Sequence, residues 1–200
     1  MWVKICGLTT PDAVEAALAA GVEAIGFVFA ESPRRVTPQA AARLAQAARG
    51  RAACVAVTRH PAQGAVDEIL AVLDPDILQS DAADLRSLSL PARLQLLPVL
   101  RASGPGEAPL PTRLLFEGPR SGTGVPCDWD AARQLAQRSQ LVLAGGLDAD
   151  NVAAAIAQVR PFGVDVSSGV EDRPGIKSPA AIARFVAAAR NADQSMRTSR

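Results

Sequence analysis

The sequence lacks any apolar run long enough to span a membrane. Hydrophobic residues make up 48% of the 200 residues, yet no stretch reaches the roughly 18 consecutive apolar residues that indicate a transmembrane helix. The amino end also lacks the basic region, apolar stretch and cleavage site of a secretion signal, because Met1 leads directly into the strand-like residues 2–6. We therefore expect a soluble, cytoplasmic protein with no membrane partner.

Cysteine, histidine and net charge are equally scarce. The three cysteines, Cys6, Cys54 and Cys127, are widely scattered and odd in number, which argues against a disulfide framework and against a CxxC metal knuckle. The single histidine, His60, precedes Pro61 in a polar loop, and we interpret it as a surface residue. The sequence shows no cluster of metal ligands, so we predict no metal site. A net charge of +1 without a basic patch argues against a nucleic-acid partner.

Short β-favouring runs alternate with helical patterns along the whole chain. Residues 24–29 form a continuous apolar strand, which is typical of a parallel sheet covered on both faces. Three prolines and two glycines in residues 101–112 predict an irregular connection in place of the fifth helix. Residues 118–126 read as a long loop. The predicted strands lie within residues 2–6, 24–29, 52–57, 76–79, 94–100, 113–117, 141–147 and 162–169, and helices are expected to begin near residues 11, 38, 66, 82, 129, 150 and 178.

Alternation of strand and helix fits both an open doubly wound sheet and a closed barrel. Eight units fill the length at roughly 25 residues each, and no GxGxxG motif follows the first strand, where a dinucleotide-binding fold would place one. We therefore predict an α/β fold, a single-domain (β/α)8 or TIM barrel over residues 1–190. Residues 191–200 show no apolar period, and we expect a flexible tail there.

Two turns rich in glycine and serine follow the last two predicted strands, in the segments LVLAGGL (141–147) and FGVDVSSG (162–169). Glycine has no Cβ to hold an anion away from backbone N–H groups, and serine adds hydroxyl donors. In a (β/α)8 barrel a phosphate often sits on the loops after strands 7 and 8. The residues that we expect to form this phosphate cup are Gly145, Gly146, Ser167, Ser168 and Gly169.

Sequence motifs at the predicted strand ends carry a family resemblance. They are KICG at 4–7, SPR at 32–34, GTG with DW within 122–129, LAGGL at 143–147, and DVSSGVE with PGIK within 165–177. In this order and spacing, from residue 3 to about 189, the chain resembles the phosphoribosylanthranilate isomerases of tryptophan biosynthesis. The resemblance implies a cofactor-free Amadori rearrangement of a small phosphorylated aminoaldose, carried out by a monomer or homodimer.

Opening the furanose ring requires an acid that protonates the ring oxygen, and the resulting Schiff base requires a base that removes the proton on C2. The resemblance assigns the base to Cys6, at the end of the first strand, and the acid to Asp128. A thiol has an ordinary pKa of about 8.5 and would need a nearby cation, such as Lys4 or Arg34, to ionise. The pKa of Asp128 would have to rise from about 3.9 through burial against the substrate.

Both assignments have a simpler alternative. A lone cysteine in an apolar strand is most often inert packing, which is our interpretation of Cys54. Cys6 differs because Gly7 follows it at a strand end. The residues alone leave open whether Cys6 is an inert packing residue or a catalytic one. An aspartate one residue before a helix is usually an N-cap, so the acid role of Asp128 depends on the resemblance.

The resemblance also implies a set of substrate-binding residues. Arg34 in the SPR motif would bind the anthranilate carboxylate, for which a guanidinium fork is suited, whereas Arg35 would be solvated. Asp165 would hold the sugar hydroxyls or the bridging amine, although it could merely anchor its strand. Lys4 and Gln79 complete the predicted substrate-binding set.

Several positions depart from the family pattern and leave other functions open. They lie after strands three, four and six and, for Ser178, directly after the PGIK segment, and none of them is a predicted acid, base or phosphate ligand. One alternative is another phosphate-binding barrel enzyme, such as an aminoaldose isomerase of histidine biosynthesis, which pairs two aspartates, or an indole-forming synthase, which uses lysine and glutamate. The other is a binding barrel without activity. The departures are Thr58 and Arg59 for Val-Asn, Ser80, Asp81 and Ala82 for the LHG of QLHG, Glu117 for Asp, and Ser178 for the Asp of PGIKD.

Overall fold

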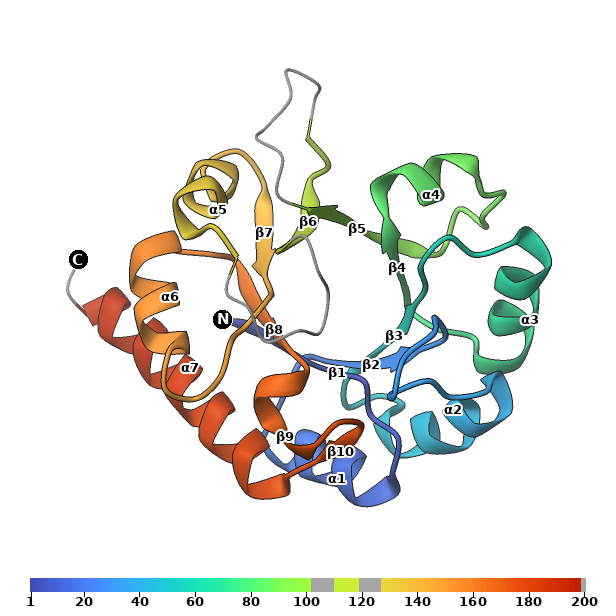
Figure 1. Ribbon diagram of the computed structural model, residues 1–200, viewed down its shortest axis with the longest axis horizontal. Helices are drawn as coiled ribbons and strands as arrows, with labels where there is room; N and C mark the ends of the chain where they lie inside the picture. Colours follow the sequence, from blue (N-terminus) through green and yellow to red (C-terminus); the bar gives the residue numbers. More distant parts are fainter. Residues whose placement is uncertain (102–109, 119–126, 199–200) are drawn as a thin grey trace.

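The computed structural model of the chain describes residues 1–101, 110–118 and 127–198. Its eight parallel strands close into a barrel in chain order, with β8 paired back onto β1 (Figure 1). This closure confirms the predicted (β/α)8 fold. The strands are β1 (Trp2–Cys6), β2 (Ala24–Val28), β3 (Ala53–Val57), β4 (Ile77–Asp81), β5 (Gln95–Arg101), β6 (Arg113–Glu117), β7 (Gln140–Leu143) and β8 (Gly163–Val166).

Helices surround the barrel, and a small antiparallel ribbon follows β8 (Figure 1). The helices are α1 (Pro11–Ala19), α2 (Pro38–Ala45) with the 3-10 turn η1 (Gln46–Ala48), α3 (Gln63–Leu73), α4 (Ala82–Ser87), α5 (Trp129–Ala136), α6 (Val152–Val159) and α7 (Pro179–Thr198). The ribbon comprises β9 (Glu171–Arg173) and β10 (Ile176–Lys177), after the 3-10 turn η2 (Ser168–Val170). Most of the connection predicted to replace the fifth helix, and most of the loop after β6, lie outside the described residues. None of the described helices is long and apolar enough to cross a membrane.

The first two helices begin where threonine and proline predict a start. Thr10 accepts a hydrogen bond from the Ala13 backbone N–H at 3.3 Å, and Thr37 accepts one from Ala40 at 3.2 Å. Proline occupies the first helical position in both helices. These caps satisfy backbone donors that a helix start leaves without partners, so the entry of each helix onto the barrel is fixed locally.

Apolar side chains fill the barrel in two shells. The strands are buried on both faces, so their side chains point alternately into the barrel and outward against the helices. The outer shell includes Ile5, Phe27 and Phe116 packed against helix residues such as Phe185. The inner shell consists of Ala24, Val55, Ile77, Leu97, Val99, Leu115, Val142 and Ala144. Because this inner shell occupies the middle of the barrel, polar groups from the strand ends are left to line its mouth.

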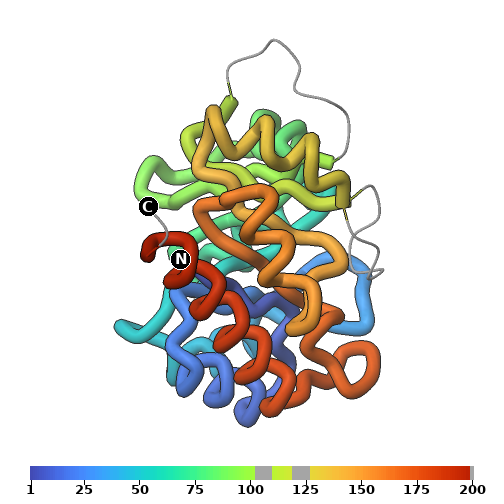
Figure 2. The backbone as a smooth tube through the Cα atoms, turned by 90° about the vertical axis from the view of Figure 1, so that its left-hand side faces the viewer, coloured from blue at the N-terminus to red at the C-terminus, as the bar shows by residue number. Residues whose placement is uncertain are grey.

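The last helix corrects the prediction of a flexible tail at 191–200. Helix α7 continues to Thr198 and lies beside the amino end of the chain, as Figure 2 shows. The Met1 amino group pairs with Asp193 at 3.0 Å, and Asp193 also pairs with Arg197 one turn later. Met196 packs against the core although no apolar period announces it. Contacts with a distant segment therefore extend the helix.

Candidate active site

A buried lysine and aspartate lie beside Cys6 at the carboxyl ends of β1 and β8. Lys4 and Asp165 are neighbours in the strand register, and Lys4 Nζ contacts Asp165 Oδ1 at 2.9 Å. Cys6 follows two residues later on the same face of β1 and is 7% exposed. Gly26 of β2 leaves the room for both side chains, because a Cβ there would lie 3.2 Å from Cys6 Sγ and 3.0 Å from Lys4 Cε. The predicted residues Lys4, Cys6 and Asp165 therefore come together at one point.

The charges around Cys6 oppose one another. Burial raises the pKa of the Cys6 thiol, the Lys4 ammonium lowers it, Asp165 raises it and Lys177 lowers it, and the net pKa lies above its ordinary value. Burial would lower the pKa of Lys4, but Asp165 and Cys6 raise it above its ordinary value. The sequence predicted that Lys4 or Arg34 would lower the pKa of Cys6. Lys4 does lower this pKa, but the rise caused by burial is larger.

Arg34 is held by a carboxylate of the ribbon after β8. Its Nε and Nη2 donate to the two oxygens of Glu171 at 2.7 and 2.9 Å, a forked pair. The Arg34 side chain is 11% exposed and crosses Gly7, where a Cβ would come within 2.6 Å of Arg34 Cδ. Arg34 is therefore held by the fold and is not solvated, while Arg35 is exposed as expected.

Lys177, on β10, binds the same glutamate and the turn after β8. Its Nζ donates to Glu171 Oε1 at 2.8 Å and to the carbonyl and hydroxyl oxygens of Ser167 at 2.9 and 3.3 Å. The Ser167 hydroxyl in turn donates to the Cys6 carbonyl at 3.1 Å. Ser167, which we predicted as a phosphate ligand, thus uses its hydroxyl to join β8 to β1. Sequence reasoning gave no role to Glu171 or Lys177, although both lie in quoted motifs.

The two turns of the predicted phosphate cup touch each other. A Cβ on Gly169 would lie 2.0 Å from the carbonyl oxygen of Leu147, so only glycine allows this approach. Gly145 and Gly146 have positive φ angles of +86° and +65°, a conformation that glycine adopts without strain. Asn151 braces the first turn by donating to the Gly146 carbonyl at 2.7 Å. The predicted proximity of the two turns is confirmed, and phosphate binding there stays a prediction.

Asp128 is the N-cap of α5. Its Oδ1 accepts the backbone N–H groups of Asp130 and Ala131 at 3.0 Å each, as the simpler alternative predicted. The residue is exposed, so the protein by itself does not supply the burial that the acid role requires. Its Oδ2 has no hydrogen-bond partner within residues 1–101, 110–118 and 127–198, and is left for other contacts.

Two of the residues that depart from the family pattern, Asp81 and Glu117, belong to one ion-pair bridge across three strand ends. Arg101, at the end of β5, pairs with Asp81 of β4 through Nη1 and with Glu117 of β6 at 2.7 Å through Nη2. Arg101 carried no signal in the sequence beyond its place at a strand end. Gln79, a predicted substrate ligand, is 6% exposed, and its Oε1 has no partner among the described residues. A buried acceptor of this kind is suited to a ligand donor.

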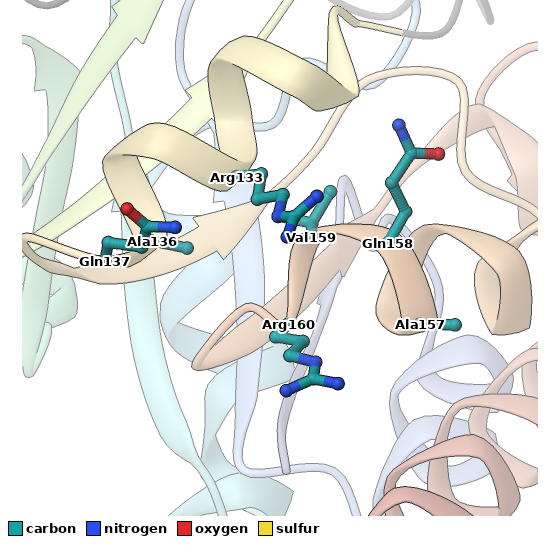
Figure 3. Close-up of a pocket in the computed structure, with 7 residues that line it drawn as sticks. All are labelled: Arg133, Ala136, Gln137, Ala157, Gln158, Val159 and Arg160. Carbon is teal, nitrogen blue, oxygen red and sulfur yellow. The ribbon is translucent and has the colours of Figure 1, made fainter.

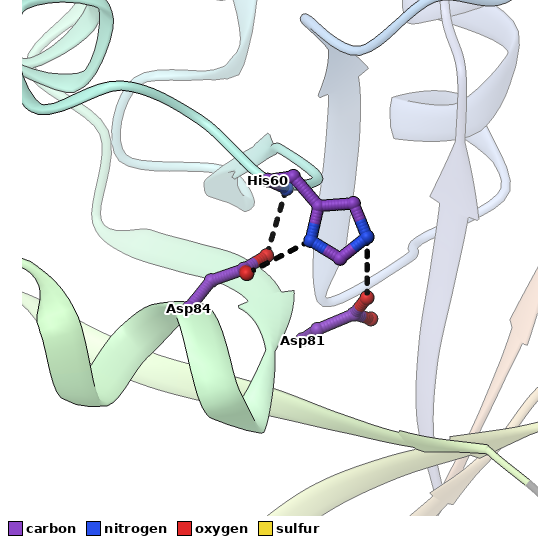
Figure 4. Close-up of side chains that lie close together, drawn as sticks. All are labelled: His60, Asp81 and Asp84. Carbon is purple, nitrogen blue, oxygen red and sulfur yellow. Dashed lines mark hydrogen bonds and ion pairs between the residues drawn. The ribbon is translucent and has the colours of Figure 1, made fainter.

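His60 meets two aspartates where β3 and β4 end (Figure 4). Its Nδ1 lies 3.0 Å from Asp84 Oδ1 and its Nε2 lies 3.9 Å from Asp81 Oδ2. The sequence predicted no metal cluster, whereas these ligand atoms all lie within 4.8 Å of one another. Both aspartates also bind protein donors, because Asp84 accepts the Ser80 hydroxyl and Asp81 pairs with Arg101. The polar atoms of this cluster are therefore engaged in hydrogen bonds and ion pairs within the protein, and His60 is exposed as predicted.

A separate pocket lies away from these residues, between α5 and α6. Figure 3 shows its lining side chains, which come from both helices and include none of the predicted site residues. They are Arg133, Ala136, Gln137, Ala157, Gln158, Val159 and Arg160.

Comparison with known proteins matches nearly the whole barrel. The family model of N-(5'-phosphoribosyl)anthranilate isomerase matches residues 3–188. The N-(5'-phosphoribosyl)anthranilate isomerase of Rhizobium etli is 40% identical over 96% of this chain and 95% of its own length. The crystal structure of TrpF from Jonesia denitrificans has a TM-score of 0.79 and 34% identity, covering 96% of this chain and 98% of that one. A phosphoribosyl anthranilate isomerase in complex with reduced 1-(o-carboxyphenylamino)-1-deoxyribulose 5-phosphate has a TM-score of 0.80 and 27% identity, with coverages of 96% and 99%. The chain belongs to the N-(5'-phosphoribosyl)anthranilate isomerase family of enzymes.

Proposed function

We propose that this chain converts N-(5'-phosphoribosyl)anthranilate to 1-(2-carboxyphenylamino)-1-deoxyribulose 5-phosphate in tryptophan biosynthesis, with Cys6 as general base and Asp128 as general acid. The observation that carries the proposal is the position of Cys6, which lies beside the Lys4–Asp165 pair and is joined by Ser167 to the turn of the predicted phosphate cup. A reactive group and an anion site are then neighbours in one barrel mouth.

The first step opens the sugar ring. Asp128 donates its proton to the ring oxygen while the bond from that oxygen to C1 breaks, and the lone pair on the anthranilate nitrogen forms the C1=N bond of a Schiff base. The Oδ2 of Asp128 suits this role, since the N-cap bonds use only Oδ1. Contact with the substrate would bury this exposed carboxyl group.

The second step moves a proton between carbons. The Cys6 thiolate removes the proton on C2, the electron pair forms C1=C2, and the C1=N electrons return to nitrogen. The enolamine then gains a proton at C1 and loses one from the C2 hydroxyl, which gives the aminoketose without net change in protons. Lys4 favours the thiolate through its positive charge, and Asp165 keeps that ammonium group in place.

The remaining predicted residues would bind the substrate. Glu171 takes two of the five N–H groups of Arg34, so the guanidinium keeps further donors for the anthranilate carboxylate. The buried Oε1 of Gln79 would accept a bond from a sugar hydroxyl or the bridging amine. The turns at Gly145, Gly146 and Ser167–Gly169 would hold the phosphate through backbone N–H groups. A cytoplasmic location and a monomeric or homodimeric state remain predictions.

The test is consumption of fluorescent phosphoribosylanthranilate by the wild-type protein and by Cys6→Ser and Asp128→Asn. We expect each variant to lose about 100-fold or more in kcat, the usual contribution of a positioned acid or base. Cys54→Ser, which replaces a buried thiol outside the site, should retain full activity. Normal turnover in both Cys6→Ser and Asp128→Asn would contradict the proposed mechanism. A wild-type protein that binds the product but turns over nothing would favour a binding barrel, and turnover of the aminoaldose from histidine biosynthesis alone would favour another isomerase.

A further inference from the structure

Lysine is almost absent from this chain, and both lysines lie at the same place. Of the 21 lysines and arginines, Lys4 and Lys177 are the only lysines. Both are buried, at 0% and 5% exposure, whereas the exposed basic positions all carry arginine. Both also act on the Cys6 thiol as positive charges. The two most deeply buried cations near Cys6 are therefore compact ammonium groups, and the guanidinium of Arg34 beside them is 11% exposed.

The three N–H groups of Lys177 match three acceptors. They are the carbonyl oxygen of Ser167, its hydroxyl oxygen and Glu171 Oε1, at 2.9, 3.3 and 2.8 Å. From Ser167 a further bond leads to the Cys6 carbonyl at 3.1 Å, and from Glu171 the forked pair leads to Arg34. Cys6, the predicted base, and Arg34, the residue predicted to bind the anthranilate carboxylate, are thus connected through the buried ammonium group of Lys177.

We propose that Lys177 is a positioning residue for the isomerase reaction, which fixes Cys6 through Ser167 and Arg34 through Glu171, so that the base and the carboxylate-binding group keep one spacing. The inference rests on the proposed function of this site. A substrate that must be gripped at its anthranilate carboxylate and deprotonated at its sugar C2 requires such a fixed spacing, because misplacement by about 1 Å can cost about 100-fold in rate.

The charge of Lys177 has an effect that is separate from its bonds. The charged groups around the Cys6 thiol are Lys4 from β1, Asp165 from β8, Lys177 from β10 and Arg34 from the loop after β2. Lys177 is, with Lys4, one of the cations that lower the pKa of Cys6, and its removal takes that effect away. The thiolate fraction at a given pH should then fall, which a purely architectural contact elsewhere in the barrel would not cause.

The experiment compares Lys177→Met with wild type. This variant leaves Glu171 paired with Arg34, so no buried charge loses every partner, and Met has a similar length. The first readout is the rate of Cys6 alkylation by iodoacetamide against pH, followed by mass spectrometry of the Cys6 peptide. We expect a fall of about threefold or more near pH 8, because the rate follows the thiolate fraction. The second readout is kcat/KM, expected to fall by about tenfold or more.

Two further variants separate positioning from stability. Arg190 resembles Lys177 in binding one glutamate and a backbone carbonyl, those of Glu23 and Gly21, but it lies at the opposite end of the barrel. The control variant Arg190→Met should therefore change neither readout. Ser167→Ala combined with Lys177→Met should lose less than the sum of the single losses in log kcat/KM, since both lie in one network.

An unchanged alkylation profile together with unchanged kcat/KM in Lys177→Met would overturn the positioning role, and so would strict additivity of the two variants. If the wild-type protein had no isomerase activity, the proposed function would fail while the alkylation readout would still decide whether Lys177 acts on Cys6.

Discussion

Replacing Gly169 by alanine tests the contact that joins the two turns of the phosphate cup. The new methyl group would lie 2.0 Å from the Leu147 carbonyl oxygen, so the two turns must separate by about 1 Å to reach the 3.0 Å at which real contacts begin. Gly169 is not among the positive-φ residues, and the cost therefore comes from the contact alone. Overpacking of this size costs about 1–3 kcal/mol, which corresponds to a fall in Tm of roughly 2–12 °C for a chain of this length.

The same separation should widen the cup. We expect the inhibition constant of inorganic phosphate and the KM of the substrate to rise by about tenfold, while kcat changes less, because the proposed base Cys6 is on a neighbouring strand. The assays are thermal unfolding and steady-state kinetics with phosphate as competitor.

Gly64→Ala is the matched control. Gly64 lies in α3, and a Cβ there meets no atom within 4 Å, so this variant should gain about 0.4–1 kcal/mol instead of losing stability. A Gly169→Ala protein with the Tm of the control, or with unchanged phosphate inhibition, would refute the inference that this contact shapes the cup.

Two further predictions concern the buried charges. Lys4→Met should lower the free energy of unfolding, measured with urea, by about 3–5 kcal/mol because it leaves the buried Asp165 without its cation. Lys4→Met combined with Asp165→Asn should recover part of that loss. Equal stability of the single and double variants would contradict this expectation. Burial would raise the pKa of Glu171, but its bonds to Arg34 and Lys177 lower it below the ordinary 4.5. The folded-state pKa is then below the unfolded one, so Glu171 contributes stability that is complete above about pH 4.5 and is lost as the pH falls through the lowered pKa. Glu171→Gln should flatten the acid limb of the stability curve, and an unaltered limb would show that the linkage lies elsewhere.

The sequence by itself determined the order of the eight barrel strands and of the described helices between them, because these depend on near neighbours. Thr10 and Thr37 predict helix starts because each caps a backbone N–H group three residues later. Runs such as Ala24–Val28 predict buried strands through their apolar composition alone. The positive φ at Gly145 and Gly146 also follows from the local demands of a tight turn. For the same reason the strand ends could be placed, and with them Lys4, Cys6 and Asp165.

Only the tertiary structure decided which of these groups meet. Closure of the barrel brings Lys4 to Asp165 across 161 residues and Arg34 to Glu171 across 137, and no local pattern encodes those pairings. In the helical segment 191–198, Asp193 pairs with the Met1 amino group from the other end of the chain, a contact that the local sequence does not reveal. The partners of Arg34 and Ser167, and the burial of Lys177, are set by strand register and by the contacts of the ribbon with the loops after β1 and β2. Short-range preferences cannot specify these contacts.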